Sequence, residues 1–396
     1  MSSGPLSGIT VLDLTQIYNG PYAAFLLAAA GAEVIKIEPP GGEHLRRRTT
    51  TGSGLPFAML NANKRCLRLD LKQEKGREIL RALARRADVL VENFAPGVMD
   101  RLGLGASVLQ AENPRLIYAM SSGYGSTGPY RDYPAMDLTV QAMAGYMSIT
   151  GFPDGPPTKA GPAVADFITG IHLYGGIVTA LLERERTGKA RAVEVAMLEA
   201  SFFPLASTLG LAQPGGDANS LRVGNRHGGL SLCPYNVYPT SDGHIAIITN
   251  NEAHWHGLLR AFGREALMDD PRCNSLKARC ANMDWVDAQV AAWTAPYPKQ
   301  QVFEMLLAER VPASPVRTLD EVVTDPHLHQ RGALRWVDHP QYGRMALPSS
   351  PLRFSDLPLH PLEPSEKLGA ESRAVLGEKL GLDAAALDTL ETDKVI

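Results

Sequence analysis

The chain has 396 residues, which at about 150 residues per domain corresponds to two domains or to one large domain with an insertion. Hydrophobic residues make up 44% of the chain and charged residues 20%, a globular mixture that excludes wholesale disorder. The formal net charge is -3, from 39 Lys and Arg against 42 Asp and Glu. This balance argues against nucleic acid or an anionic membrane surface as a partner.

The cysteines are widely spaced and form no CxxC pair, which favours reduced thiols over a disulfide framework or a zinc site. The N-terminal segment has no basic region and carries Asp13 where a signal peptide stays apolar. The longest uncharged stretch, residues 14–32, contains Asn19 and Pro21 and is a poor membrane span. We therefore expect a cytoplasmic protein without a membrane segment.

The first 200 residues alternate β-branched runs with helical patterns, which is typical of a mostly parallel sheet covered by helices. Strands are expected over residues 8–14, 32–38, 66–71, 87–94, 115–122 and 191–198. Helices are expected over residues 22–30, 72–87 and 167–185. The pattern predicts an α/β fold with a Rossmann-like large domain over residues 1–200.

The composition changes near residue 215, where QPGGDANS has the character of a linker, so a linker is expected over residues 201–225. Two alternating runs over residues 234–250 predict a hairpin that turns at Ser241–Gly243. Helical patterns follow over residues 252–262, 285–294 and 299–309. We expect a smaller α+β domain over residues 226–325, and residues 326–396 as a linker and C-terminal part returning to the large domain.

The turn after the first strand, TQIYNGPYAA, has one glycine, so the GxGxxG signature of dinucleotide sites is absent from this turn. The P-loop, GxSxG, HExxH and kinase signatures are absent from the whole sequence. A nicotinamide site at the first turn, and P-loop, serine-nucleophile or HExxH zinc chemistry, therefore have no motif to support them.

Acidic and amide residues stand at expected strand ends or helix starts: Gln16, Asn93, Asp137 and Asp166. Asp166 precedes an apolar helical segment, and its simplest interpretation is an N-cap, because aspartate accepts hydrogen bonds from the first free N–H groups. Asp137 before LTVQAMAG permits the same interpretation. From the residues alone, a cap and a functional carboxylate are both open.

Six blocks of the sequence, in order, resemble the family III CoA-transferases, also called the CaiB/BaiF or formyl-CoA transferase-like family. They are GITVLDLTQIYNGPYAAFLLAAAGAEVIKIEPPGGE, NANKRCLRLDLK, ADVLVENFAPGVMDRLGL, SSGYGSTGPYRDYPAMDLTVQAMAG, GFPDGPPTKAGPAVADFITGIHLYGGIVTALLERERTGKA and VGNRHGG. The resemblance covers nearly the whole chain. It implies an enzyme with a CoA thioester as substrate, no permanently bound cofactor, and a homodimer of interlocked chains.

The resemblance implies that Asp166 is a catalytic nucleophile. A carboxylate with an ordinary pKa near 3.9 is ionised at neutral pH and needs no adjacent base. It would attack the thioester of an acyl-CoA to give a mixed anhydride, which the released CoA converts to an aspartyl-CoA thioester that an acceptor acid then opens. Water must be kept out, and N–H groups at the start of the helix are expected to stabilise an oxyanion.

By the same resemblance, the CoA nucleotide lies against the large domain. The matching positions are Tyr18, Asn19, Leu69, Asp70, Leu71, Lys72, Asn93, Phe94, Ala95 and Arg101. Lys72 and Arg101 would supply cations for phosphates, the alternative being solvated surface charges. Some members carry an arginine where this chain has Pro39, so that contact is either absent here or replaced by Arg46 or Arg47. The run Arg46–Arg48 is also weak support for a small carboxylate acceptor with succinyl-CoA as a candidate donor.

Gln16 and Asp137 match positions near the reacting centre and are expected to orient the substrate. Gly228 and Gly229 resemble a glycine-rich loop that closes over the site, the alternative being a plain turn.

Three alternatives stay open: an α-methylacyl-CoA racemase, a hydrolase with a carboxylate nucleophile and a non-catalytic CoA-binding protein. The racemase's histidine falls on Met136, which carries no proton. His172 lies six residues after Asp166 and is expected to be a packed core histidine.

Overall fold

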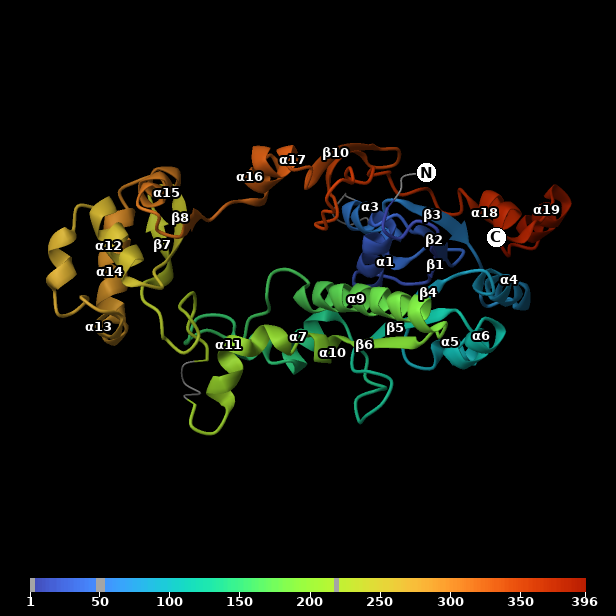
Figure 1. Ribbon diagram of the computed structural model, residues 1–396, viewed down its shortest axis with the longest axis horizontal. Helices are drawn as coiled ribbons and strands as arrows, with labels where there is room; N and C mark the ends of the chain where they lie inside the picture. Colours follow the sequence, from blue (N-terminus) through green and yellow to red (C-terminus); the bar gives the residue numbers. More distant parts are fainter. Residues whose placement is uncertain (1–3, 48–53, 217–220) are drawn as a thin grey trace. The chain divides into compact units, whose positions relative to one another are not determined.

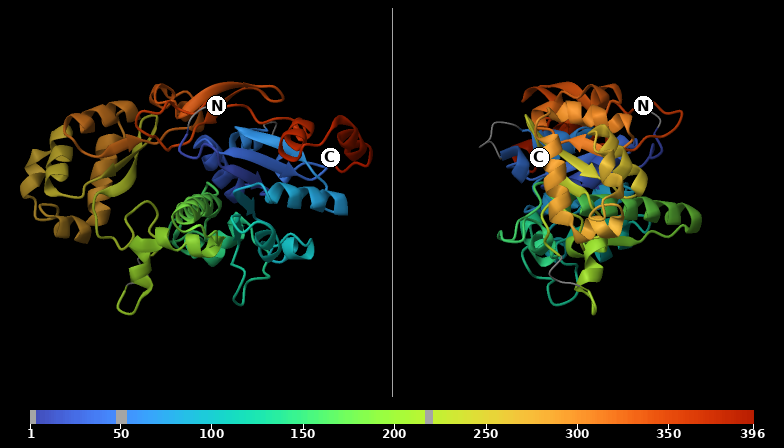
Figure 2. Two further views of the ribbon diagram at one scale, coloured as in Figure 1. Left: turned by 45° about the vertical axis from the view of Figure 1, so that its right-hand side comes forward. Right: turned by 90° about the vertical axis from the view of Figure 1, so that its left-hand side faces the viewer.

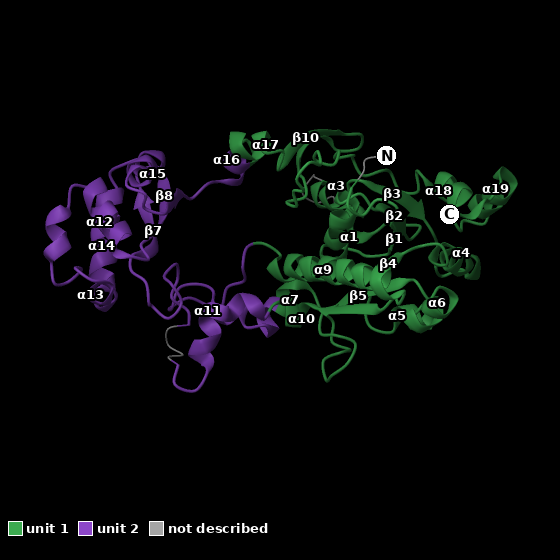
Figure 3. Cartoon of the chain, viewed as in Figure 1, with its two compact units in different colours: residues 1–140, 162–201, 323–396 green, residues 141–161, 202–322 purple. Residues whose placement is uncertain are grey.

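The computed structural model describes residues 4–47, 54–216 and 221–396. The chain divides into two compact units (Figure 3): unit 1 contains residues 1–140, 162–201 and 323–396, and unit 2 contains residues 141–161 and 202–322. The predicted large domain over residues 1–200 therefore differs at residues 141–161, which belong to unit 2. The reason is a long-range contact, since Gly224 donates its N–H to the carbonyl of Gly151 at 3.0 Å.

Unit 1 is built on a six-stranded parallel sheet, which confirms the predicted α/β class. Its strands are β1 (Thr10–Asp13), β2 (Glu33–Glu38), β3 (Lys64–Arg68), β4 (Val89–Glu92), β5 (Ile117–Ser122) and β6 (Ala192–Ala196). Their order across the sheet is β3-β2-β1-β4-β5-β6, the doubly wound order of Rossmann folds. In the centre, Leu12 pairs with Ile35 on one side and Leu90 on the other.

Helices cover both faces of this sheet (Figures 1 and 2). Helices α1 (Asn19–Ala29) and α9 (Val164–Thr187) bury Leu27 and Leu173 against one face. Helices α4 (Glu74–Ala84), α18 (Ser372–Leu380) and α19 (Ala384–Thr392) bury Leu80, Leu376 and Leu390 against the other. The C-terminal helices, red in Figure 1, thus complete a core begun by the first strands.

The remaining elements of unit 1 are short. They are α2 (His44–Arg47), α3 (Leu55–Asn61), α5 (Val98–Arg101), α6 (Ala106–Glu112), α7 (Asp137–Met143, which runs on into unit 2), α10 (Met197–Ala200), α17 (Pro326–Gln330), β10 (Leu334–His339) and β11 (Gly343–Pro348). Strands β10 and β11 form an antiparallel hairpin. This hairpin lies in the segment that composition indicated as part of a linker. Its side chains are mostly exposed or half-buried, so its strands LRWVDH and GRMALP lack the clear apolar alternation that predicts a strand.

Unit 2 has a three-stranded antiparallel sheet with its own core. The predicted hairpin is confirmed as β7 (Tyr235–Thr240) and β8 (Gly243–Ile248), and the sequence pattern missed β9 (Ala313–Pro315), which pairs with β8. Its helices are α8 (Tyr146–Ile149), η1 (Phe203–Leu205), α11 (Ala206–Leu209), η2 (Gly210–Ala212), α12 (Glu252–Ala261), η4 (Glu265–Asp269), α13 (Leu276–Ala281), α14 (Met283–Thr294), α15 (Lys299–Ala308) and α16 (Leu319–Val323). Trp255, Leu258 and Val290 are buried at the centre of this core.

Helix α9 is long and apolar enough to cross a membrane by length and composition. Within unit 1, however, it lies along α1 and strands β5 and β6, and it buries Asp166 and Arg184. Helices in the cores of soluble folds pass the same test of length and composition.

Candidate active site

The order of the strands places a crevice at one end of the unit 1 sheet. Sequential connections run outward in opposite directions from the neighbouring strands β1 and β4. In doubly wound sheets, ligands bind at such a switch point, beyond the carboxyl ends of the strands. The segments that leave these ends, residues 14–17 and Asn19 after β1 and residues 93–96 after β4, line two cavities in unit 1.

The first cavity, here the Asp166 cavity, has a volume of about 530 Å³. Its described lining is Gln16, Ile17, Asn19, His44, Arg47, Asn93, Phe94, Ala95, Pro96, Ser121, Ser122, Gly123, Arg131, Tyr133, Pro134, Ala135, Met136, Asp166 and Met197. The carboxylate of this lining comes from Asp166, whereas three basic side chains surround the same space. The cavity therefore suits an anionic ligand placed against one carboxylate.

Asp166 stands in the first turn of α9 and is 6% exposed. Its carboxylate does not cap the helix, so the N-cap interpretation was wrong. The helix begins two residues earlier, at Val164, and Asp137 supplies the cap: its Oδ1 accepts the N–H groups of Ala165 at 3.0 Å and of Asp166 at 3.3 Å. The Asp166 carboxylate is thereby left for the cavity.

The same contacts correct a second expectation, that N–H groups at the start of α9 stabilise an oxyanion. The first two, of Val164 and Ala165, donate to the carbonyl of Pro162 and to Asp137. The next two, of Asp166 and Phe167, donate to Asp137 and to the carbonyl of Ala163. All four donors have partners within the protein.

The pKa of Asp166 is raised from its ordinary value of 3.8 to about 6. Burial is the main cause, and the negative charge of Asp137 adds to it, whereas hydrogen bonds from Asn19 oppose the rise. With a pKa near 6, ionised Asp166 still outnumbers the protonated form by about ten to one at pH 7. Asp166 is therefore a poorly solvated carboxylate that is charged at neutral pH.

A chain of amide hydrogen bonds leads from the end of β1 to Asp166. Asn93 accepts the N–H of Gln16 and donates to its carbonyl, both at 2.8 Å. Asn93 Nδ2 also donates to Asn19 Oδ1 at 2.9 Å, as does Ser121 Oγ at 3.0 Å. Asn19 Nδ2 donates to Asp166 Oδ1 at 3.0 Å. Gln16, Asn19 and Asn93 were predicted site residues, and Ser121 was missed because a serine at the end of a strand carries no distinctive signal.

Two glycines permit this close arrangement. A Cβ on Gly170, one turn after Asp166, would lie 2.6 Å from the carbonyl oxygen of Asn19. A Cβ on Gly20 would lie 2.3 Å from Cγ2 of Thr15. Helix α1 therefore starts in contact with α9, which brings Asn19 within hydrogen-bonding distance of Asp166.

Buried charges hold the turn between β1 and α1. Asp13 accepts from Lys64 Nζ at 2.8 Å and from the N–H of Thr15 at 2.9 Å, and its pKa is lowered because the two buried lysines Lys36 and Lys64 outweigh the effect of burial. Ile17 has φ of 66°, unusual for a β-branched residue. Such strain, of about 1–3 kcal/mol, occurs at sites that the surrounding structure constrains.

The second cavity, here the Lys72 cavity, has a volume of about 650 Å³. The predicted CoA-binding residues on its described lining are Arg47, Leu69, Asp70, Leu71, Lys72, Phe94 and Arg101. Gln16, Arg47 and Phe94 line both cavities. The two cavities therefore adjoin, and one extended ligand would have cations at one end and Asp166 at the other.

The arginines of the run 46–48 differ in what they contact. Arg46 is committed to Glu38, with Nε to Oε2 at 2.8 Å and Nη2 to Oε1 at 2.8 Å, and its guanidinium lies over the ring of Phe57. Arg47 is exposed and lines both cavities. Arg46 and Arg47 are the two candidates to take the place of the arginine that some family members carry at the position of Pro39. Arg47 lines both cavities and Arg46 lines neither, so the geometry favours Arg47. Arg48 lies outside the described residues.

Four other residues named from the sequence lie elsewhere. Tyr18 stacks on Phe167, with ring centroids 6.0 Å apart, and is in the described lining of neither cavity. Gly228 and Gly229 belong to unit 2, so their role at the site stays a prediction. His172 is exposed on α9 rather than packed in a core, because the face that the helix turns to the sheet carries Leu173 and Ile177 instead.

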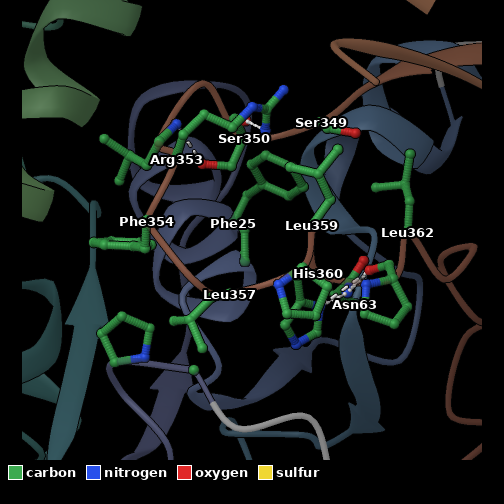
Figure 4. A pocket seen from close by; sticks show the side chains of 16 residues that line it. Phe25, Asn63, Ser349, Ser350, Arg353, Phe354, Leu357, Leu359, His360 and Leu362 are labelled. Atoms are coloured by element: carbon green, nitrogen blue, oxygen red, sulfur yellow. Dashed lines mark hydrogen bonds between the residues drawn. The ribbon is translucent and has the colours of Figure 1, made fainter. Parts of the chain in front are cut away.

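A further cavity of about 290 Å³ lies between α1 and the segment that follows β11 (Figure 4). Phe25, Phe354 and Leu359 contribute its apolar surface, and Asn63 bonds to His360 at 2.8 Å. Its described lining contains no carboxylate or thiol. It therefore offers no group for the nucleophilic chemistry that Asp166 offers.

Unit 1 thus holds a buried carboxylate in one cavity, and the adjoining cavity carries the cations Arg47, Lys72 and Arg101 together with the carboxylates of Glu38, Glu43 and Asp70. Residues 6–372 match the model of CoA-transferase family III, so the chain belongs to this family.

Curated relatives of the chain are named as CoA-transferases, in agreement with this family. The chain is 37% identical to a formyl-CoA:oxalate CoA-transferase of Streptomyces avermitilis, over 99% of both chains. It is also 37% identical to a succinate–glutarate CoA-transferase of Agrobacterium fabrum, over 94% of this chain and 95% of that one. Among solved structures, a CaiB/BaiF family protein from Brucella suis matches with a TM-score of 0.84 and 33% identity, over 96% of this chain and 100% of the other. The chain is thus a CoA-transferase, an enzyme that uses CoA thioesters as substrates.

Proposed function

We propose that this enzyme moves CoA from an acyl-CoA to a small carboxylic acid through covalent intermediates on Asp166. One observation carries the proposal: Asp166 is a buried, ionised carboxylate that faces a cation-lined cavity, while Asp137 caps its helix. A carboxylate freed from a structural role and poorly solvated is a competent nucleophile.

The reaction balances in four steps without ATP. Asp166 attacks the thioester carbonyl, the C–S bond breaks, and CoA leaves as a thiolate from a mixed anhydride. The thiolate attacks Cγ of Asp166, and the donor acid leaves as a carboxylate. The acceptor carboxylate then attacks the aspartyl-CoA thioester at Cγ and releases the thiolate, which finally attacks the acyl carbonyl of the acceptor and regenerates Asp166. Each step exchanges one activated acyl bond, a thioester or an anhydride, for another, so the activation is never lost to water.

The two cavities suggest how the substrate is divided. Lys72, Arg101 and Arg47 of the Lys72 cavity would hold the phosphates of CoA. The pantetheine arm would pass Gln16, Asn93, Phe94 and Ala95 toward Asp166. This assignment also covers the predicted contacts of Leu69, Asp70 and Leu71.

The acids exchanged are proposed to be small and to include dicarboxylates, with succinyl-CoA as a donor. His44, Arg47 and Arg131 line the Asp166 cavity, and arginine matches a carboxylate with two parallel hydrogen bonds. Relatives named for oxalate, glutarate and mesaconate support this choice.

Arg131 lines the Asp166 cavity and not the Lys72 cavity, so Arg131→Gln should raise KM for a dicarboxylate acceptor and leave KM for a monocarboxylate unchanged.

The mechanism is tested by trapping the covalent intermediate on Asp166. After incubation with succinyl-CoA, hydroxylamine or mass spectrometry should find the modification on Asp166, and Asp166→Ala should form no adduct and transfer no CoA. Transfer at the normal rate by Asp166→Ala would exclude the mechanism. Deuterium uptake at the α-carbon without CoA transfer would instead identify an epimerase, although Met136 carries no proton for that reaction.

We also propose that the protein is cytoplasmic, from the spacing of its cysteines, and that it is a homodimer, as the resemblance to the family implies. Light scattering should give twice the chain mass of 42.7 kDa. A mass equal to that of one chain would contradict the dimer without bearing on Asp166.

A further inference from the structure

We propose that Asn19 is a catalytic residue whose side-chain amide stabilises the oxyanion at Cγ of Asp166, and that Asn93 and Ser121 position this amide. The inference rests on the proposed function, since it assigns a role within the covalent mechanism. The resemblance to the family assigned Asn19 to CoA binding, whereas the structure places its amide on Asp166.

The mechanism creates a need for a donor at this point. In the second and third steps the nucleophile adds to Cγ of Asp166, and the aspartyl oxygen that keeps its bond to carbon takes up the electron pair. A fixed donor near 3 Å from that oxygen stabilises the negative charge. The four N–H groups at the start of α9, the usual source of such donors, already have partners.

Asn19 supplies such a donor. Its Nδ2 is 3.0 Å from Asp166 Oδ1, and Asn19 is 7% exposed. Its other acceptor is the sulfur of Met197 at 3.6 Å, a weak one. With Oδ1 held by Asn19, Oδ2 is the oxygen that attacks the thioester, and Oδ1 is the carbonyl oxygen on which the charge later develops.

The orientation of the Asn19 amide follows from the backbone. Asn93 accepts from the N–H of Gln16 and donates to its carbonyl, which determines which end of the Asn93 amide carries the nitrogen. Because Asn93 Nδ2 donates to Asn19, the atom of Asn19 that receives it is the oxygen. Ser121 Oγ donates to the same oxygen. The nitrogen of Asn19 therefore faces Asp166.

The decisive experiment separates the steps. Protein is mixed with succinyl-CoA without an acceptor, quenched at short times, and examined by intact-mass spectrometry for the aspartyl-CoA adduct. Asn19→Ala should form the adduct about 100-fold more slowly, the usual cost of losing one oxyanion donor, with KM for succinyl-CoA within about threefold of wild type. A rate of adduct formation within threefold of wild type would overturn the inference.

A double-mutant cycle tests the positioning. Ser121→Ala should slow adduct formation a few-fold, since Asn93 still holds Asn19, and it should have no further effect in the Asn19→Ala background. Additive effects would show that Ser121 acts independently of Asn19 and would refute its positioning role.

The outcomes also distinguish this inference from the mechanism itself. If Asp166→Asn is inactive and Asn19→Ala behaves as wild type, the mechanism stands and the role of Asn19 fails. If Asp166→Asn still transfers CoA, the covalent mechanism fails, and the role of Asn19 fails with it. Circular dichroism of each variant verifies that a slow rate does not reflect unfolding.

Discussion

At the scale of single residues, the site depends on the cost of keeping Asp166 charged in a poorly solvated place. Its pKa near 6 means that the folded protein binds a proton more tightly than the unfolded chain, whose ordinary value is 3.8. The ionised group therefore lowers the stability of the fold above pH 6, and this cost disappears below pH 4. The proposed mechanism needs Asp166 in its ionised form, and this same ionisation lowers the free energy of unfolding.

We therefore predict that Asp166→Asn stabilises the protein in a pH-dependent way. At pH 7–8 its free energy of unfolding should exceed that of wild type by up to about 3 kcal/mol, from two pKa units at 1.36 kcal/mol each. The difference should shrink as the pH falls from 6 to 4, because wild-type Asp166 then takes up its proton. Thermal or denaturant unfolding across this range measures it, and a difference that is the same at every pH would contradict the burial argument.

The neighbouring residues Arg46 and Arg47 provide a matched pair of substitutions. Arg46→Gln removes the partner of Glu38, whose side chain is fully buried, and should lower the free energy of unfolding by about 3 kcal/mol. Arg47→Gln, at an exposed position beside both cavities, should leave stability unchanged and raise KM for the acyl-CoA by about tenfold or less. The reverse pattern, a destabilised Arg47→Gln protein with a normal KM, would show that the roles are exchanged.

At the scale of elements, the contact between α1 and α9 determines the geometry of the site. Glycine inside a helix ordinarily lowers helix stability by about 0.5–1 kcal/mol relative to alanine. In α9, Gly170 offsets this cost by its lack of a side chain, which leaves room for the backbone of Asn19.

Two alanine substitutions in α9 should therefore have opposite effects. Gly170→Ala should lower both stability and kcat, because it separates α1 from α9 and weakens the bond from Asn19 to Asp166. Gly175→Ala, where an added Cβ would meet nothing within 4 Å, should raise stability by up to about 1 kcal/mol and leave kcat unchanged. Melting curves and initial rates measure both, and equal effects of the two would exclude the close-approach argument.

At the scale of the whole molecule, each unit has its own hydrophobic core, and both cavities lie in unit 1. We predict that CoA slows amide hydrogen exchange in unit 1 peptides that contain residues 10–19 and 89–95, because a ligand stabilises the part of the protein that binds it. A peptide over residues 235–248 of unit 2 serves as the internal control and should be unchanged. Equal protection of both regions, measured by mass spectrometry, would show that the two units respond as one.

The sequence pattern located the strands of the parallel sheet and the hairpin of unit 2, because apolar alternation and turn residues are local signals. It missed β9, a strand of three residues, and the β10–β11 hairpin, whose side chains are mostly exposed or half-buried. Both depend on pairing with distant or adjacent strands rather than on a strong local pattern.

The order of residues was enough to indicate the family and to single out Asp166, because motifs and their spacing are written along the chain. It did not decide whether Asp166 or Asp137 caps α9, whether Arg46 or Arg47 is available to a ligand, or what Asn19 contacts. Those outcomes depend on groups from 8 to 147 positions apart along the chain that meet near the carboxyl end of one sheet. Packing alone brings such groups within 3 Å of one another, so the chemistry of this site was decided by its tertiary structure.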